Sequence, residues 1–106
     1  MNIQFKKGVL ELCVLSLLGK TDRYGYDIAA AFSDKIGISD GTVYPVLRRL
    51  MGDAYLSSYL QESNEGPPRK YYTITNKGRV FRAELYDEWV RLTGEVNKLA
   101  EEGVSA

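Results

Sequence analysis

The last third of the chain carries large apolar residues at alternating intervals of four and three. Such spacing is typical of a helix that packs one apolar stripe against another helix. The stripe consists of Leu85, Trp89, Leu92, Val96 and Leu99. A helix over 76–102 would be roughly 40 Å long, whereas a body formed by residues 1–75 has an expected radius of gyration of only about 11 Å. Part of the stripe therefore requires a partner other than this body.

The residues before this helix predict three shorter helices. Residues 4–18 are apolar around most of the helical circumference, which indicates a buried, central helix. A second helix is marked by apolar residues at helical spacing, namely Ile28, Ala29, Phe32 and Ile36. Gly37 ends that helix, and Ser39 can cap a third one over about 40–52. Pro45 is expected near the start of the third helix, where a missing amide donor costs least.

After the third predicted helix, the spacing of the residues changes from the helical period to a period of two. Residues 55–62 alternate with a period of two, and residues 69–74 are rich in Tyr, Thr and Ile, so both segments predict strands. The Gly- and Pro-containing turn between them predicts a β-hairpin, and Thr75 can cap the last helix. The predicted fold class is mainly α with a small β-hairpin (α+β). This order of elements is the one expected of a winged helix-turn-helix over residues 1–75, whose third helix can enter a DNA major groove, followed by a long C-terminal helix over residues 76–106.

Composition excludes several functional classes. The chain has no histidine and one cysteine, so neither a zinc site of Cys and His ligands nor Ser–His or Cys–His catalysis can be assembled. No glycine spacing matches a phosphate-binding loop. We therefore expect no enzymatic activity, no catalytic or metal-binding residues and no cofactor.

The lone cysteine and the apolar run around it indicate the cellular setting. Cys13 cannot form an intramolecular disulfide, which favours a reducing environment and hence the cytoplasm. The apolar run from Val9 to Leu18 contains Glu11 and is shorter than the roughly 20 residues of a membrane span. We therefore expect a buried helix here and no membrane association.

Charge is distributed unevenly along the chain. The 14 Lys and Arg residues balance the 14 Asp and Glu residues. Residues 1–79 carry eleven basic and eight acidic side chains, a net charge of +3, whereas residues 80–106 carry three and six, a net charge of −3. Overall neutrality thus conceals a mildly basic body, which suits contact with nucleic acid.

Five short segments occur together in an informative order. They are Gly8-Val9-Leu10-Glu11-Leu12, Tyr24-Gly25-Tyr26-Asp27-Ile28, Gly41-Thr42-Val43-Tyr44-Pro45, Gly66-Pro67-Pro68-Arg69-Lys70-Tyr71-Tyr72 and Thr75-Asn76-Lys77-Gly78. With these segments the chain resembles the PadR family of bacterial transcriptional regulators over nearly its whole length. The resemblance implies a homodimeric repressor that binds double-stranded DNA and dimerises through its C-terminal helix.

Two backbone positions bear on this resemblance. Gly25 is expected to allow a close approach of another segment to the start of the second helix. Ala54 stands where similar members usually have Gly, and alanine tolerates a left-handed helix cap poorly. We therefore expect either that the third helix ends earlier, at Gly52, or that the chain leaves it with a different geometry.

The expected DNA contacts lie on the third helix and on the hairpin, which we call the wing. On the helix they are Thr42, Tyr44, Arg48 and Arg49, and on the wing they are Arg69 and Lys70. A solvated helix face is the alternative for the two helix arginines, and Tyr44 can equally pack under the helix. Charges that protect an exposed strand edge are the alternative for Arg69 and Lys70.

The apolar stripe of the last helix is the expected dimer interface, and Trp89 admits a second role there. Its indole can pack in the dimer core or form a stacking platform for a small aromatic or hydrophobic effector. A different function is also open: a winged-helix module that binds another protein through the last helix and does not read DNA. The behaviour of that module toward duplex DNA would not depend on salt concentration. The affinity of a DNA-binding regulator for duplex DNA would instead fall steeply as the salt concentration rises.

Overall fold

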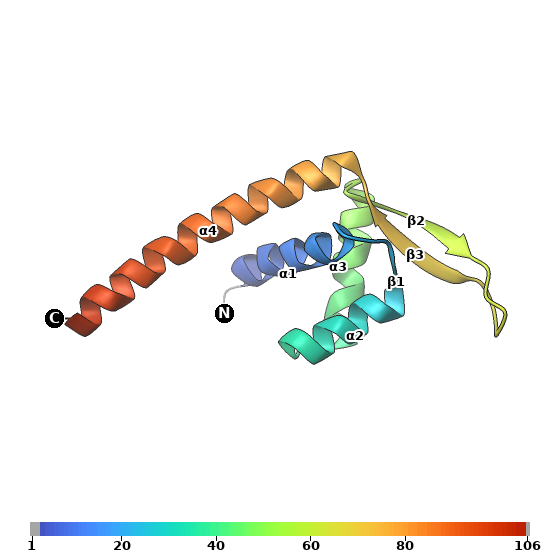
Figure 1. Cartoon of the computed structure of the whole chain (residues 1–106), viewed down its shortest axis with the longest axis horizontal. Helices are drawn as coiled ribbons and strands as arrows, with labels where there is room; N and C mark the ends of the chain where they lie inside the picture. The colour runs from blue at the N-terminus through green and yellow to red at the C-terminus, as the bar shows by residue number, and fades with distance from the viewer. Residues whose placement is uncertain (1–2, 106) are drawn as a thin grey trace.

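The computed structural model describes residues 3–105, which form an elongated molecule of 62 × 27 × 22 Å (Figure 1). Its elements in chain order are α1 (Ile3–Leu18), β1 (Arg23–Tyr24), α2 (Gly25–Ile36), α3 (Asp40–Gly52), β2 (Leu56–Gln61), β3 (Arg69–Ile74) and α4 (Asn76–Ser105). The predicted α+β fold, with three helices, a wing and a long last helix, is confirmed.

The core forms around α1, as its uniformly apolar sequence predicts. Leu15 and Leu18 of α1 are almost fully buried, together with Phe32 of α2 and Leu47 and Leu50 of α3. Burying a side chain of this kind contributes about 1.5 to 3 kcal/mol to stability. The helices are thus held by one shared core, and α4 packs along α1 outside it (Figure 1).

Capping residues set most of the helix boundaries. Gly37 adopts the left-handed conformation with φ of 70°, and its N–H donates to the Phe32 carbonyl, so the predicted end of α2 is confirmed. The Thr75 hydroxyl accepts a 3.0 Å hydrogen bond from the Gly78 N–H at the start of α4, also as predicted. Ser39 precedes α3 as expected, but its hydroxyl lies 3.3 Å from that of Thr42 and makes no bond to a backbone N–H of the helix.

The sheet has one strand more than the sequence predicts. β1 pairs antiparallel with β3, which gives the order β1-β3-β2. The sequence does not indicate β1, because a strand of two residues is too short to show a period. Tyr72 of β3 is paired with both Arg23 and Ser58 and faces the core, where it is buried.

The connection from α3 to β2 departs from the sequence-based expectation at Ala54. The helix does end at Gly52, one of the two predicted alternatives, yet Ala54 still adopts the left-handed conformation with φ of 63°. Hydrogen bonds hold this turn: the Ala54 N–H donates to the Met51 carbonyl over 3.1 Å, and the Thr75 hydroxyl donates to the Ala54 carbonyl over 2.7 Å. These bonds offset the strain of an alanine in this region.

The first turns of α4 are fixed to the body. Arg79 donates to the Gly19 carbonyl over 3.2 Å, and the Phe81 ring stacks on Tyr55 with 4.2 Å between centroids. Gly78 is buried, and a Cβ at this position would collide with the Tyr55 carbonyl. Farther along, α4 extends beyond the N-terminal end of α1 (Figure 1). No helix within residues 3–105 is both long and apolar enough to span a membrane.

Candidate nucleic-acid interface

One face of α3 is left outside the core. Val43, Val46, Leu47 and Leu50 turn inward, whereas Tyr44, Pro45 and Arg48 are exposed. This division follows from the helical period, because the buried residues recur at intervals of three and four. Arg48 therefore presents its guanidinium to solvent, as a contact with DNA requires.

Tyr44 and Thr42 lie at the beginning of this face. Tyr44 is 38% exposed, and part of its ring packs over the start of α2. A Cβ added at Gly25 would lie 3.7 Å from the Tyr44 ring and 3.2 Å from the Tyr72 ring, so the expected close approach at Gly25 is confirmed. Thr42 is half-buried beside Ser39. Tyr44 therefore combines a packing role with an exposed edge.

Arg49 lies differently from its neighbour Arg48. Its Nη2 atom is 3.4 Å from Oε1 of Glu11, a buried carboxylate on α1. The Arg49 Nε is also buried and has no hydrogen-bond partner within the part of the chain that the structure describes. The Arg49 side chain is thus turned toward α1. The helical spacing of residues around Arg49 could not indicate this orientation, because its partner Glu11 lies 38 positions away in the sequence.

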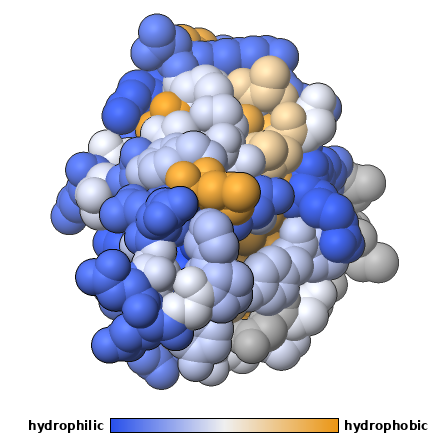
Figure 2. All heavy atoms as spheres, turned by 90° about the vertical axis from the view of Figure 1, so that its right-hand side faces the viewer, coloured by the Kyte–Doolittle hydropathy of each residue, from blue (hydrophilic) through white to orange (hydrophobic). Residues whose placement is uncertain are grey.

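The two basic residues of the wing lie on opposite faces of β3, because consecutive strand residues alternate. Arg69 lies over the ring of Tyr24, with 5.1 Å from Cζ to the centroid. Lys70 lies over the ring of Tyr72 at 5.4 Å. Both side chains are exposed near the wing tip, where hydrophilic surface dominates the end view of the molecule (Figure 2). Their charges are therefore available from two sides of the wing.

A row of tyrosines on the outer face of the sheet was not predicted as a unit. Tyr71 packs against Tyr24 and Tyr59 with centroid distances of 6.0 and 5.8 Å, and Tyr26 continues the row from Tyr24 at 6.2 Å. The period of β2 and β3 could have indicated the pair on those strands, but the link to α2 depends on the unpredicted β1. The row therefore places flat tyrosine rings, with their polar edges, beside Arg69.

The end of this row is tied down by a hydrogen bond. The Tyr59 hydroxyl donates to Oδ2 of Asp22 over 2.8 Å. This bond to the carboxylate, followed by desolvation and by the negative charge of Asp22, raises the pKa of Tyr59 above its ordinary value.

The exposed fraction of the residues in the predicted interface stripe on α4 increases toward the C-terminus. Leu85 is half-buried against the core, Trp89 is 36% exposed and Leu99 is 68% exposed. Tyr86 and Val90 broaden the stripe with further exposed apolar surface. The described part of the chain thus leaves a continuous apolar face on α4 that the body does not cover.

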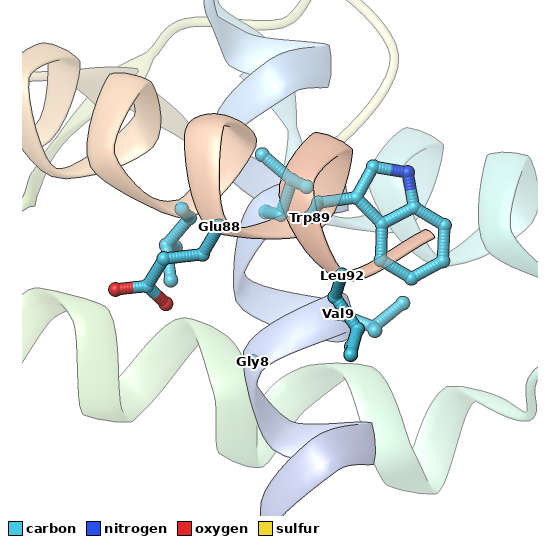
Figure 3. A pocket seen from close by; sticks show the side chains of 7 residues that line it. Gly8, Val9, Glu88, Trp89 and Leu92 are labelled. Atoms are coloured by element: carbon cyan, nitrogen blue, oxygen red, sulfur yellow. The ribbon is translucent and has the colours of Figure 1, made fainter. Parts of the chain in front are cut away.

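A small groove lies where this stripe meets α1. Its volume is about 170 Å³, and Val9, Leu12, Leu85, Trp89 and Leu92 form its apolar walls. In Figure 3 the indole of Trp89 and the carboxylate of Glu88 flank the groove from opposite sides. Of the predicted site residues, Leu85, Trp89 and Leu92 thus line this groove with α1, whereas those on α3 and on the wing lie outside it.

The described residues hold few groups suited to metal or thiol chemistry. Residues 3–105 contain no group of three or more Cys, Asp or Glu side chains arranged to hold a metal ion. Cys13 is free and half-buried, and desolvation raises the pKa of its thiol. This thiol therefore ionises less readily than an exposed one.

Comparison with known proteins agrees with this architecture. Residues 14–84 match the family described as the transcriptional regulator PadR-like family. A PadR-like transcriptional regulator from Bacillus cereus is 34% identical and superposes with a TM-score of 0.81 over 92% of this chain and 96% of that one. A PadR-like transcription factor described as from bacteroid fragilis is 42% identical, with a TM-score of 0.77 over 91% and 94% of the two chains.

A relative in Bacillus subtilis carries a functional name. It is described as a negative transcriptional regulator, PadR, and is 29% identical over 78% of this chain. Our chain spans only 46% of the length of that protein. Because the family match extends from α1 to α4 and includes the wing, the chain belongs to the PadR-like family of transcriptional regulators.

Proposed function

We propose that this regulator is a homodimeric repressor that binds a pseudo-palindromic operator in double-stranded DNA. The observation that carries the proposal is the free face of α3, which exposes Arg48 beside a wing whose Arg69 and Lys70 are also exposed. In winged helix-turn-helix proteins the corresponding helix enters the major groove. The net charge of +3 over residues 1–79 adds attraction to phosphates.

The proposed contacts differ in kind. Arg48 reaches base edges or phosphates from the exposed face of α3, and Tyr44 and Thr42 lie toward the start of the same helix. Arg69 and Lys70 contact phosphates from the wing. Arg49 is proposed with Arg48, and its ion pair with Glu11 makes it less available to DNA than Arg48. In this scheme residues 1–75 bind DNA and residues 76–106 dimerise.

The exposed stripe of α4 supports the dimer. A second copy packed on Trp89, Leu92, Val96 and Leu99 would remove from water an apolar face that the chain's own body leaves open. A two-fold dimer presents two copies of α3 to half-sites about 34 Å apart along one face of DNA. The name of the relative in Bacillus subtilis supports repression as the outcome.

The groove beside Trp89 supports a role for a small aromatic or hydrophobic effector. Its volume of about 170 Å³ in one chain is smaller than the roughly 300 to 1,000 Å³ of typical small-molecule sites. A second copy packed on the same stripe would enlarge it, with the two indoles facing one cavity. An effector that prefers the conformation unable to bind DNA would release the operator, and DNA would weaken effector binding by the same factor.

Selection of bound sequences from a random duplex pool tests the proposal. The enriched sequence and a scrambled duplex are then compared at one salt concentration. We expect an inverted repeat in the enriched pool and an affinity for it about 10³-fold or more above that for the scrambled duplex. Absence of enrichment, together with capture of the chain in a complex with a different protein, would favour the non-DNA-binding module instead.

A further inference from the structure

The wing carries a large apolar side chain that the body does not cover. Leu60 of β2 is 69% exposed, nearly the same fraction as Leu99 on the distal part of α4. Leu99 belongs to the stripe that a second copy would cover, whereas the wing lies at the opposite end of the molecule (Figure 1). The proposed dimer therefore gives Leu60 no partner.

The strand register places Leu60 on the side of the sheet that packs against the helices. Leu60 is paired with Lys70, and closer to the body Ser58 is paired with Tyr72. Alternate residues of a strand share a face, so the pair of Leu60 and Lys70 continues the face that carries Leu56 and Tyr72 in the buried core. Helix α3 packs against β2 in this core. Leu60 and Lys70 thus extend beyond the core on the side of the wing that α3 occupies.

An apolar side chain and a cation therefore lie next to each other on one face of the wing. Directly opposed residues of an antiparallel pair have Cβ atoms about 4.5 to 5.5 Å apart. Lys70 is exposed, and neither of the two ion pairs found within residues 3–105 involves it. The backbone of DNA offers matching groups, because its charged phosphates alternate with deoxyribose rings that are largely apolar.

The position of the wing beside α3 selects the groove. A recognition helix occupies the major groove, which is about 12 Å wide. The two grooves alternate along one face of a duplex, so a wing on the flank of α3 meets the adjacent minor groove. That groove is only about 6 Å wide, which admits a single side chain such as that of Leu60.

We propose that Leu60 contacts the floor of the minor groove beside the site of α3 and makes the wing sensitive to the base pairs there. A G·C pair places the guanine N2 amino group in the minor groove, whereas an A·T pair presents only acceptors. The amino group projects from the floor, and a leucine over it removes its water without replacing the hydrogen bond, which costs free energy. Leu60 therefore favours A·T pairs at these positions. This inference rests on the proposed function, to which it adds a source of sequence preference.

Three duplexes that differ only at these positions test the base preference. Each contains the selected operator, and hydroxyl-radical footprinting of the wild-type complex locates the flanking minor-groove positions. The first duplex carries A·T pairs there, the second G·C pairs and the third inosine·cytosine pairs, which lack the N2 amino group. The wild-type chain should bind the first and third within about twofold of each other and the second about fivefold or more weakly.

The variant Leu60→Ala should lose this preference. It should bind all three duplexes within about twofold of one another, with an affinity for the A·T duplex about fivefold or more below that of the wild-type chain. The slope of log affinity against log salt should stay at the wild-type value, because no charge is removed. Since Leu60 is exposed, its truncation leaves the core intact.

Two further variants serve as controls. Val80→Ala truncates another exposed apolar side chain, away from the wing, and should match the wild-type chain on all three duplexes. Lys70→Ala should lower the salt slope and keep the preference for A·T pairs, because it removes the phosphate contact and leaves Leu60 in place.

The outcomes separate this inference from the proposed function. A preference for A·T pairs that persists in Leu60→Ala would assign it to the shape of the groove and would overturn the role of Leu60. Equal affinities of the wild-type chain for all three duplexes would overturn it as well. In both cases an enriched inverted repeat and a steep salt slope would leave the proposed repressor standing. A wild-type chain that selects no duplex would reject both.

Discussion

Glu11 of α1 and Arg49 of α3 form an ion pair across the core, with 3.4 Å between Oε1 and Nη2. Glu11 is only 7% exposed, and it is the one charged residue among the buried side chains of the described part of the chain. The Arg49 side chain is 33% exposed, so solvent reaches the pair from the side of α3. The pair thus joins the central helix to the proposed recognition helix, whereas Arg48 remains outside it.

Replacement of the two consecutive arginines should therefore have different effects. Arg49→Ala leaves the Glu11 carboxylate buried without its partner and should reduce the free energy of unfolding by about 1 to 3 kcal/mol. Arg48→Ala should change it by no more than about 0.5 kcal/mol. Urea unfolding measures both variants at one protein concentration. Equal stabilities would show that the ion pair is unimportant for the fold.

The wing variants address DNA binding itself. Arg69→Ala and Lys70→Ala should each weaken binding to specific and non-specific duplexes alike, because phosphate contacts carry no sequence information. Each should reduce the slope of log affinity against log salt by about one. Lys98→Ala on the distal part of α4 serves as the control of equal charge. A salt slope that stays at the wild-type value in both wing variants contradicts phosphate contact.

The stripe on α4 can be tested without disturbing the core. Val96 is 52% exposed and lies on the stripe, whereas Val80 is 61% exposed and lies outside it. Val96→Glu should raise the dimer dissociation constant at least about tenfold, because a charge would be buried at the interface. Val80→Glu should leave it unchanged. Sedimentation over a range of concentrations gives both values, and a wild-type chain that is monomeric at micromolar concentration would refute the dimer.

Alanine substitutions at two glycines of α4 should change the stability of the chain in opposite directions. A Cβ at Gly78 would collide with the Tyr55 carbonyl and lie 2.9 Å from Cγ1 of Ile74. Gly78→Ala should therefore destabilise the chain by about 1 to 3 kcal/mol as the helix is pushed from the turn. A Cβ at Gly94 would meet no described atom within 4 Å, so Gly94→Ala should stabilise the helix by up to about 1 kcal/mol. Thermal unfolding at one protein concentration compares the stabilities of the two variants. An unchanged stability in Gly78→Ala would show that the contact between position 78 and the Tyr55 carbonyl can relax freely.

The bond between Tyr59 and Asp22 predicts a pH effect at the alkaline end. The bond to the carboxylate raises the pKa of Tyr59 in the folded chain above the ordinary value of about 10. The contribution of this bond to stability is therefore complete below about pH 10 and is lost as the pH rises through the raised pKa. NMR titration of the tyrosine rings should show the pKa of Tyr59 falling toward 10 in Asp22→Asn, and Tyr59→Phe assigns the signal. An identical pKa in Asp22→Asn would exclude Asp22 as the cause.

Local sequence determined much of this fold. Helical and alternating periods, together with Gly37 and Thr75 as caps, depend on residues close together in the chain, so the order of helices and the wing could be read from them. The stripe on α4 was predictable for the same reason. The family segments then indicated which of these elements face DNA in similar proteins.

Tertiary structure decided the features that depend on distant residues. β1 exists only because β3 lies beside it, and Ala54 holds a left-handed turn because Thr75, 21 positions later, bonds its carbonyl. Arg49 turns toward α1 because Glu11 is buried there, while Arg48 with the same side chain stays exposed. A local pattern encodes a helix or strand, but only packing brings such separated groups within bonding distance.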